Sequence, residues 1–121
     1  MESHDVDILA GRLSASMSFT QKVWALTTQI PRGRVTTYAE LARAVGGRRF
    51  RGFRAIGMAM NRNPHAPRVP CHRVVGSDGR LVGYAGGLDK KRRLLAQEGV
   101  IVVAGRVDLD QHLFRFNSCP A

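Results

Sequence analysis

The segment Pro70-Cys71-His72-Arg73 places a thiol directly beside an imidazole and a guanidinium. A cysteine attacks as its thiolate, a form that neighbouring cations favour and that a nearby base can generate. Cys71 is therefore a candidate nucleophile, with His72 as its base. The alternative is that Cys71 is a small buried hydrophobic residue, the usual role of a lone cysteine. The nearby Arg68 and Arg73, and the polar loops on either side, favour the reactive interpretation.

The charge balance indicates the kind of partner. The 121 residues include 19 Lys+Arg against 9 Asp+Glu, a formal net charge of +10. Such a surface attracts polyanions, because each phosphate it neutralises releases condensed counterions. Composition therefore favours a nucleic acid partner over a basic surface that is merely solvated. The hydrophobic fraction of 44% is typical of a globular chain and excludes a disordered one.

The sequence gives no sign of a membrane, secretion or metal site. Its longest apolar stretch, residues 100–104, is too short to span a bilayer, and its start lacks the basic-then-apolar order of a secretory signal. We expect a cytoplasmic protein, or a nuclear one if the source is eukaryotic. Cys71 and Cys119 form no C-x-x-C pair, so neither a structural zinc nor a disulfide framework is expected. We expect Cys119 to be incidental.

Three helices are predicted before the reactive segment. Ser or Thr followed three residues later by Gln or Glu predicts helices that begin at Ser18 and Thr37, and a third covers about residues 54–62. Short helices with tight connections predict a helix-turn-helix whose last helix lies on DNA, with a plain three-helix core as the alternative. We expect one domain over residues 18–116, with a short leader or helix fragment before it and a tail at 117–121.

The second half is predicted to mix loops, strands and one helix. The expected elements are an extended segment at 69–75, a turn at 77–79, a glycine-rich loop at 83–87, a helix from Asp89 to about Glu98, and strands at 100–107 and 113–116 that form a terminal hairpin. The run Lys90-Lys91-Arg92-Arg93 is expected to face solvent or phosphate. The predicted fold class is mainly α with a small β element, a winged-helix-like or helix-turn-helix DNA-binding catalytic domain.

Beyond these patterns, the segment Pro70-Cys71-His72-Arg73-Val74 resembles the O6-alkylguanine-DNA alkyltransferases. Further positions match the family's pattern in the same order: Tyr38, Arg54, Asn63, Tyr84-Ala85-Gly86-Gly87 and Glu98. The resemblance covers roughly residues 19–100. A five-residue motif alone is moderately specific, and the additional matches in order make the resemblance strong.

The resemblance implies a single-turnover reaction without a dissociable cofactor or metal. The Cys71 thiolate would attack the alkyl carbon on O6 of guanine and keep the alkyl group. His72 would act as general base through a water, and Glu98 would orient and charge-balance the imidazole. Tyr38 would give a proton to the departing guanine. Asn63 would hold the turns around Cys71 through bonds to the backbone.

The resemblance also implies how the substrate is reached. The target base lies inside a stacked duplex and must be extruded, and Arg54 would fill the gap it leaves. The helix of Arg54 would enter the minor groove, where Ala55 and Gly57 allow close approach. Tyr38 and Arg73 are also expected to contact DNA. The residues expected to line the base pocket are Val74, Tyr84, Ala85 and Gly86. The implied partner is double-stranded DNA containing alkylated guanine, bound by a monomer that also meets other repair proteins.

The chain departs from the family pattern in three places. Ala85 stands where many relatives have serine, the connection at 47–53 is longer and richer in arginine, and little of the usual N-terminal domain precedes residue 18. If the position of Ala85 works through its backbone N–H, the first change costs little. The catalytic positions are retained, so the departures bear on stability and regulation more than on chemistry.

Three other classes of protein are alternatives to an alkyltransferase. The alkyltransferase-like proteins share the fold, are short and bind damaged bases without reacting, but they carry tryptophan where this chain has Cys71. A basic helix-turn-helix regulator would explain the charge and leave Cys71 and His72 idle. A zinc-dependent base deaminase is excluded, because Val74 occupies the position of its second cysteine and no His-x-Glu precedes it.

Overall fold

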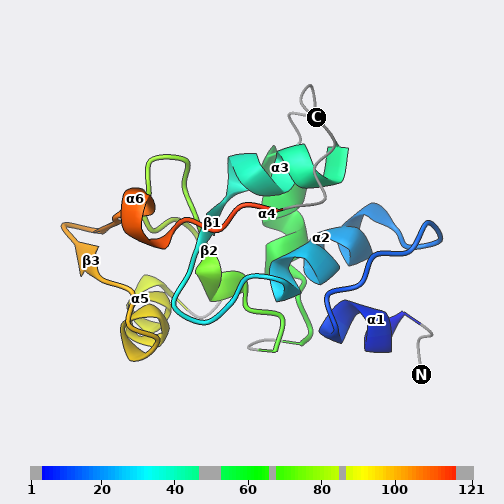
Figure 1. Cartoon of the computed structure of the whole chain (residues 1–121), viewed down its shortest axis with the longest axis horizontal. Helices are drawn as coiled ribbons and strands as arrows, with labels where there is room; N and C mark the ends of the chain where they lie inside the picture. The colour runs from blue at the N-terminus through cyan, green and yellow to red at the C-terminus, as the bar shows by residue number, and fades with distance from the viewer. Residues whose placement is uncertain (1–3, 47–52, 66–67, 85–86, 117–121) are drawn as a thin grey trace.

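The chain forms an elongated, mostly helical structure in which two groups of elements flank a small central sheet. The computed structural model describes residues 4–46, 53–65, 68–84 and 87–116. Helices α1 and α2 lie at one end, and α5, α6 and the β3–β4 hairpin lie at the other (Figure 1). Within the described residues, no helix is long and apolar enough to cross a bilayer. The predicted fold class, mainly α with a small β element, is confirmed.

The first group is built from four helices. They are α1 (Asp5–Leu9), α2 (Phe19–Thr28), α3 (Tyr38–Gly46) and α4 (Phe53–Asn61). The predicted capping box begins α2, since the Ser18 hydroxyl accepts from the Gln21 amide and the Gln21 side chain accepts from the Ser18 amide. The Thr37 hydroxyl likewise accepts from the Glu40 amide at the start of α3. Local side-chain chemistry therefore sets where these helices begin.

Helices α2, α3 and α4 share the main hydrophobic core. Its buried members are Val23, Leu26, Ile30, Leu41, Ala42, Ile56, Ala59, Met60, Cys71, Val74 and Phe116. The indole N–H of Trp24 donates to the Ala59 carbonyl at 2.8 Å, which ties α2 to α4. Cys71 belongs to this core, so the reactive segment is fixed by the same packing that holds the three helices together.

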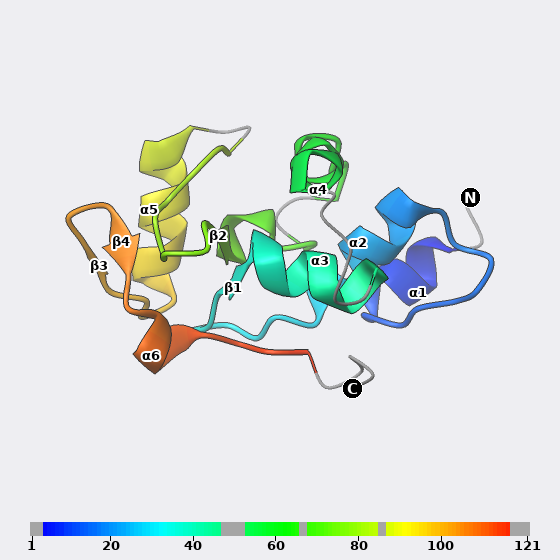
Figure 2. The same cartoon turned by 90° about the horizontal axis from the view of Figure 1, so that it is seen from above.

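A short parallel sheet joins the two groups. Strand β1 (Thr36–Thr37) pairs with β2 (Val74–Val75), with Thr36 opposite Val74 and Thr37 opposite Val75. Figure 2 shows β2 lying between α5 and the helices of the first group. Because β1 leads directly into α3 and β2 follows Cys71 closely, the pairing brings the start of α3 beside the reactive segment.

The prediction of an extended segment over 69–75 is only partly correct. Residues Val74–Val75 form β2, but Cys71–Arg73 form a short 3-10 turn, η1. The turn is closed by the Arg73 amide, which donates to the Pro70 carbonyl at 2.9 Å. Turn formation moves Cys71 out of a regular strand and into the core beside α2 and α3.

The predicted terminal hairpin is wrong in its partners. The hairpin pairs β3 (Val102–Val103) with β4 (Arg106–Val107), and a short helix, α6 (Leu109–His112), follows it. The turn residues Ala104 and Gly105 have φ values of 53° and 76°, as a two-residue type I′ hairpin requires. The expected strand at 113–116 is absent from the described structure apart from a bridge between Leu113 and Val35. Helix α5 (Leu88–Gln97) completes this group.

Candidate active site

Cys71 lies at the start of η1, where core and surface meet. Its side chain is 7% exposed, and Tyr38 and Tyr84 pack against the cluster that contains it. Tyr38 comes from the first turn of α3, and Tyr84 from the loop after β2. The structure therefore brings Tyr38 and Tyr84 to the core cluster that contains Cys71.

His72, which follows Cys71 in η1, forms a buried pair with Glu98. The two side chains are 2% and 8% exposed, and His72 Nε2 lies 3.0 Å from Glu98 Oε2. Glu98 ends α5, which packs against η1, so the helix delivers the carboxylate to the imidazole. The predicted partnership of these two residues is present as a direct hydrogen bond.

The charge states of the pair follow from its surroundings. Burial lowers the pKa of His72 below its ordinary value of 6.5, although the Glu98 carboxylate acts in the opposite direction. Burial would raise the pKa of Glu98, but hydrogen bonds from Arg73 and His72 outweigh it and lower that pKa below 4.5. At neutral pH the pair is thus a neutral imidazole and an ionised carboxylate.

These charge states decide which imidazole nitrogen carries the proton. An ionised carboxylate can only accept, so His72 Nε2 must donate to Glu98 and Nδ1 must hold a free lone pair. Nδ1 is buried and makes no hydrogen bond within the described residues. A buried acceptor without a partner is costly and rare in proteins. The arrangement leaves a neutral base ready to take a proton.

Arg73 contributes to this pair rather than to an outer surface. Its Nε and Nη2 donate to the two Glu98 oxygens at 2.9 and 2.7 Å, and Nη1 donates to the Ile30 carbonyl at 2.7 Å. The side chain is only 16% exposed. The structure therefore gives Arg73 a different position from the DNA contact predicted from the sequence, because a buried carboxylate needs a close cation.

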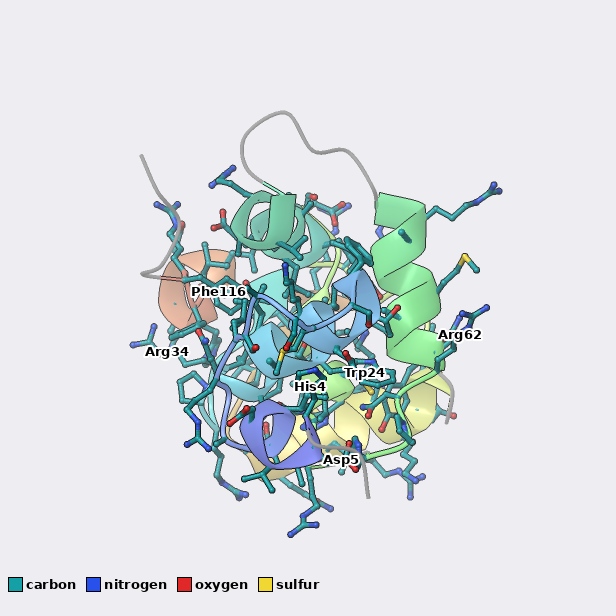
Figure 3. The ribbon with its side chains drawn as sticks, turned by 90° about the vertical axis from the view of Figure 1, so that its right-hand side faces the viewer. His4, Asp5, Trp24, Arg34, Arg62 and Phe116 are labelled. Carbon is teal, nitrogen blue, oxygen red and sulfur yellow. The ribbon has the colours of Figure 1, made fainter. Side chains whose placement is uncertain are left out.

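Asn63 supports the approach to Cys71. Its Nδ2 donates to the Val69 carbonyl at 2.8 Å, and its Oδ1 accepts from the His65 amide at 2.9 Å. The His65 ring meets Trp24 edge-on, and its Nε2 lies 3.6 Å from Asp5 of α1. Asp5 and Trp24 appear together at this end of the molecule (Figure 3). The segment that leads into η1 is thus held from two helices.

A hollow of about 500 Å³ opens at Tyr38, which packs against the cluster that contains Cys71. Its lining residues are Tyr38, Arg54, Gly57, Ser77, Val82 and Gly83. The volume lies in the range of about 300–1,000 Å³ that is common for small-molecule sites. Burial and the nearness of Cys71 raise the pKa of Tyr38 above 10.0, so its hydroxyl stays protonated at neutral pH. The lining of the hollow therefore contains both a proton donor, Tyr38, and an exposed arginine of α4, Arg54.

The structure describes only some of the other residues that were predicted to line the pocket or contact DNA. Ala85 and Gly86 lie outside the described residues. Val74 is fully buried in the core, so its side chain packs there and does not line the hollow. Ala55 lies between Arg54 and the buried Ile56 on α4 and is partly exposed. Sequence analysis missed Ser77 and Val82, which carry no motif and reach the hollow only through the tertiary fold.

Lys91 is the main site residue that the sequence analysis placed wrongly. It was expected to face solvent or phosphate, but it is fully buried. Its Nζ donates to the carbonyls of Val74 (2.6 Å), Val82 (2.8 Å) and Gly83 (3.3 Å). Burial lowers its pKa to about 8, and the nearby Cys71 acts in the opposite direction. Helical spacing could have indicated this burial, because Lys91 precedes the buried Leu95 by one turn and so lies on the same face of α5.

Comparison with known proteins identifies the family. Residues 18–100 match the family described as 6-O-methylguanine DNA methyltransferase, DNA binding domain. The methylated-DNA–protein-cysteine methyltransferase of Methanosarcina barkeri is 51% identical over 80 residues, which are 66% of this chain and 49% of that protein. The protein of the same name from Mycobacterium leprae is 48% identical over 80 residues, 66% of this chain and 47% of that one. The chain thus spans about half the length of the curated relatives it matches.

Solved structures agree with the family match. The fold is similar to Mycobacterium tuberculosis OGT in complex with DNA, with a TM-score of 0.63 and 39% identity over 77% of this chain and 62% of that chain. It is also similar to S. pombe Atl1 in complex with damaged DNA containing O6-carboxymethylguanine, with a TM-score of 0.68 and 31% identity over 80% of this chain and 94% of that chain. By sequence and by fold, the chain belongs to the family of the 6-O-methylguanine DNA methyltransferase DNA-binding domain.

Proposed function

We propose that this protein repairs double-stranded DNA by transferring an alkyl group from O6 of guanine to Cys71, once per molecule and without a dissociable cofactor. The observation that carries the proposal is the His72–Glu98 pair, which leaves a buried neutral imidazole with a free Nδ1 on the residue next to Cys71 in the chain. The relatives named methylated-DNA–protein-cysteine methyltransferase support the same reaction.

The first step makes the nucleophile. The Cys71 thiol proton passes to His72 Nδ1 through a bridging water, which leaves a thiolate and an imidazolium. The ionised Glu98 accepts from Nε2 and stabilises the imidazolium that forms. Arg73 holds Glu98 in its charged state through two hydrogen bonds. Each charged group thus supports the proton transfer from a fixed position.

The second step moves the alkyl group. The Cys71 sulfur forms a bond to the alkyl carbon, the bond from that carbon to O6 breaks, and its electron pair passes to the guanine. The Tyr38 hydroxyl gives its proton to the departing base, and the proton held by His72 restores Tyr38 through solvent. The balance is a thioether at Cys71 and an unmodified guanine. Because nothing in this balance regenerates the thiol, each molecule reacts once.

Access to the base is proposed to come from α4. A base inside a duplex must be extruded before its O6 substituent can reach a buried sulfur. Arg54 lies in the first turn of α4, is exposed and lines the hollow, so it can enter the base stack as the guanine enters the site. Figure 3 shows α4 at the margin of the molecule, with Arg62 near its far end. The small Gly57 lets the helix approach a duplex closely.

A second candidate is a protein that binds the lesion without reacting. The similarity to S. pombe Atl1, which covers 94% of that chain, favours it. The presence of a cysteine next in the chain to a histidine with a free ring nitrogen favours transfer instead, since a protein that only binds the lesion needs neither. The same binding surface serves both candidates, and only the chemical step separates them.

The test is incubation with duplex DNA that contains one O6-methylguanine, followed by peptide mass spectrometry. Alkyl transfer predicts one added methyl group on the Cys71 peptide and an equal amount of repaired guanine. A Cys71→Ser variant is the matched control and should bind the duplex without gaining mass. Tight binding by the native protein with no mass gain would identify a protein that only binds the lesion. Equal binding to damaged and undamaged duplex would indicate a general DNA-binding protein.

A further inference from the structure

Lys91 is a fully buried lysine that the reaction described above does not use. It projects from α5, the helix that also delivers Glu98, and α5 packs against η1. A lysine is rarely fully buried without a counter-charge, because an ammonium loses its hydration. Within the described residues no carboxylate forms an ion pair with it. Its burial therefore needs a reason other than an ion pair.

Hydrogen bonds give part of that reason. An ammonium has three N–H donors, and Lys91 directs them to three backbone carbonyls. One carbonyl belongs to Val74, the first residue of β2 directly after η1, and the others belong to Val82 and Gly83, which line the hollow. The Lys91 side chain thus links the residue that follows the Cys71–Arg73 turn to the wall of the hollow, although these two segments are separated in the sequence.

Charge gives the other part. Cys71 is the acidic group whose nearness raises the Lys91 pKa against the larger effect of burial, and the net result is a pKa of about 8. The other titratable groups at this place are His72, whose pKa the Lys91 charge helps to lower, and the two tyrosines that pack beside Cys71. At neutral pH Lys91 thus supplies a buried positive charge close to a sulfur that must become negative.

We propose that Lys91 is a positioning residue for the reaction: its ammonium fixes the wall of the hollow against the reactive turn and stabilises the Cys71 thiolate by its charge. The link to alkyl transfer rests on the function proposed above, whereas the effect on the thiolate does not. A lysine that only joined the two segments would leave the ionisation of Cys71 unchanged. The experiments below distinguish these two roles.

The first experiment uses the native side chain. The sequence contains three lysines, Lys22, Lys90 and Lys91, so carbon-13 NMR of their ε carbons reports each titration separately. In a Cys119→Ser background, iodoacetamide converts Cys71 to a neutral thioether. The proposal predicts that this change lowers the Lys91 pKa by about one unit, because the negative partner is lost. Lys22 and Lys90 are the internal controls. An unchanged Lys91 titration would overturn the electrostatic part.

The second experiment measures how fast iodoacetamide reacts with Cys71 as a function of pH. Lys91→Gln keeps hydrogen-bond donors without charge, Lys91→Met removes both, and Lys90→Met is the matched control on the exposed neighbour. The proposal predicts that both Lys91 variants move the midpoint of the reaction to higher pH by about one unit, while Lys90→Met does not. If both Lys91 variants keep the native midpoint, the lysine only holds the two segments together.

The outcome does not depend on DNA repair. Both measurements use a small electrophile and no nucleic acid, so they succeed or fail whether or not the protein accepts alkylated guanine. Circular dichroism identifies any variant that does not fold, and the NMR titration, which leaves Lys91 unaltered, then decides the question. A failure of methyl transfer with a shifted Lys91 titration would reject the repair function and keep the Lys91 inference.

Discussion

The reactive centre and the outer face of α4 hold their charges in opposite ways. At the centre, His72, Glu98 and Arg73 are buried or nearly so and make short hydrogen bonds to one another. On α4, Arg54 is exposed to solvent, and so is Arg62, which directly follows the helix. Buried charges act strongly over short distances and are barely screened, whereas exposed charges are weakened by salt. We therefore expect the rate of alkyl transfer to depend on pH and on single side-chain substitutions at the centre. We expect the affinity for DNA to depend on salt concentration.

Removing the Cys71 sulfur should abolish methyl transfer and leave DNA binding intact. Cys71→Ser is expected to lower methyl transfer by at least about 10³-fold, because a serine hydroxyl is a far weaker nucleophile than a thiolate. Its affinity for alkylated duplex should stay within about twofold, since the α4 face is unchanged. Transfer of a radiolabelled methyl group and a binding titration measure the two effects. Cys119→Ser is the control and should retain transfer, and transfer by Cys71→Ser would contradict the assignment of the nucleophile.

Neutralising Glu98 should damage both chemistry and stability. Glu98→Gln removes the charge that orients His72, and we expect transfer to slow by about 10²-fold or more. It also leaves Arg73 without its partner in a mostly buried place, which should cost about 3 kcal/mol of unfolding free energy. Single-turnover kinetics and urea unfolding measure these effects.

The matched control is the exposed ion pair at Asp78, which contacts Arg80 and Arg106 at 3.8 Å. Asp78→Asn should lower the urea midpoint of unfolding far less than Glu98→Gln does, because exposed ion pairs contribute little to stability. Equal losses for the Glu98 and Asp78 variants would mean that burial does not distinguish the two sites.

Acid should slow the chemical step before it unfolds the protein. A protonated His72 cannot accept the thiol proton, so the transfer rate should fall about tenfold per pH unit below the His72 pKa, which burial places under 6.5. Because the pKa values of His72 and Glu98 are both lowered by folding, the unfolded chain binds more protons, and stability falls as pH falls. The melting temperature should therefore decline below pH 6.5 and again below pH 4.5. A rate that rises on acidification would exclude His72 as the base.

The smallest expected change in the transfer rate comes from a substitution on the exposed face of α4. Arg54→Ala should lower transfer from duplex DNA by about tenfold, because extrusion of the base loses its stabilising wedge. Transfer from an alkylated free guanine base should change by less than about twofold, since no stack has to be opened. The comparison of the two substrates in parallel kinetic assays is the measurement. An equal loss on both substrates would place Arg54 in the chemical step.

The sequence was a good guide where the relevant physics is local. The capping residues Ser18 and Gln21 predicted the start of α2 because a side chain meets a backbone amide within one turn. The motif around Cys71 and the matching Tyr38 and Glu98 named side chains that the structure places near one another, with Tyr38 at the Cys71 cluster and Glu98 bonded to His72. These patterns need no knowledge of distant contacts.

Features that depend on distant contacts were missed. The burial of Lys91 requires three carbonyls that only the fold brings together, so a charged run gave the wrong expectation. Arg73 lies beside Glu98 because α5 returns to η1. The bridge between Leu113 and Val35 replaces a predicted strand for the same reason. Pairing partners are set by tertiary packing, which propensity and spacing do not encode.

The proposed mechanism requires that His72 is a neutral base whose proton lies on Nε2, facing Glu98. Nitrogen-15 NMR of the imidazole at pH 7 tests it most directly, because the chemical shifts of the two ring nitrogens report which one is protonated. We expect a protonated Nε2 that is hydrogen-bonded to Glu98 and an unprotonated Nδ1. A proton on Nδ1, or on both nitrogens, would contradict it.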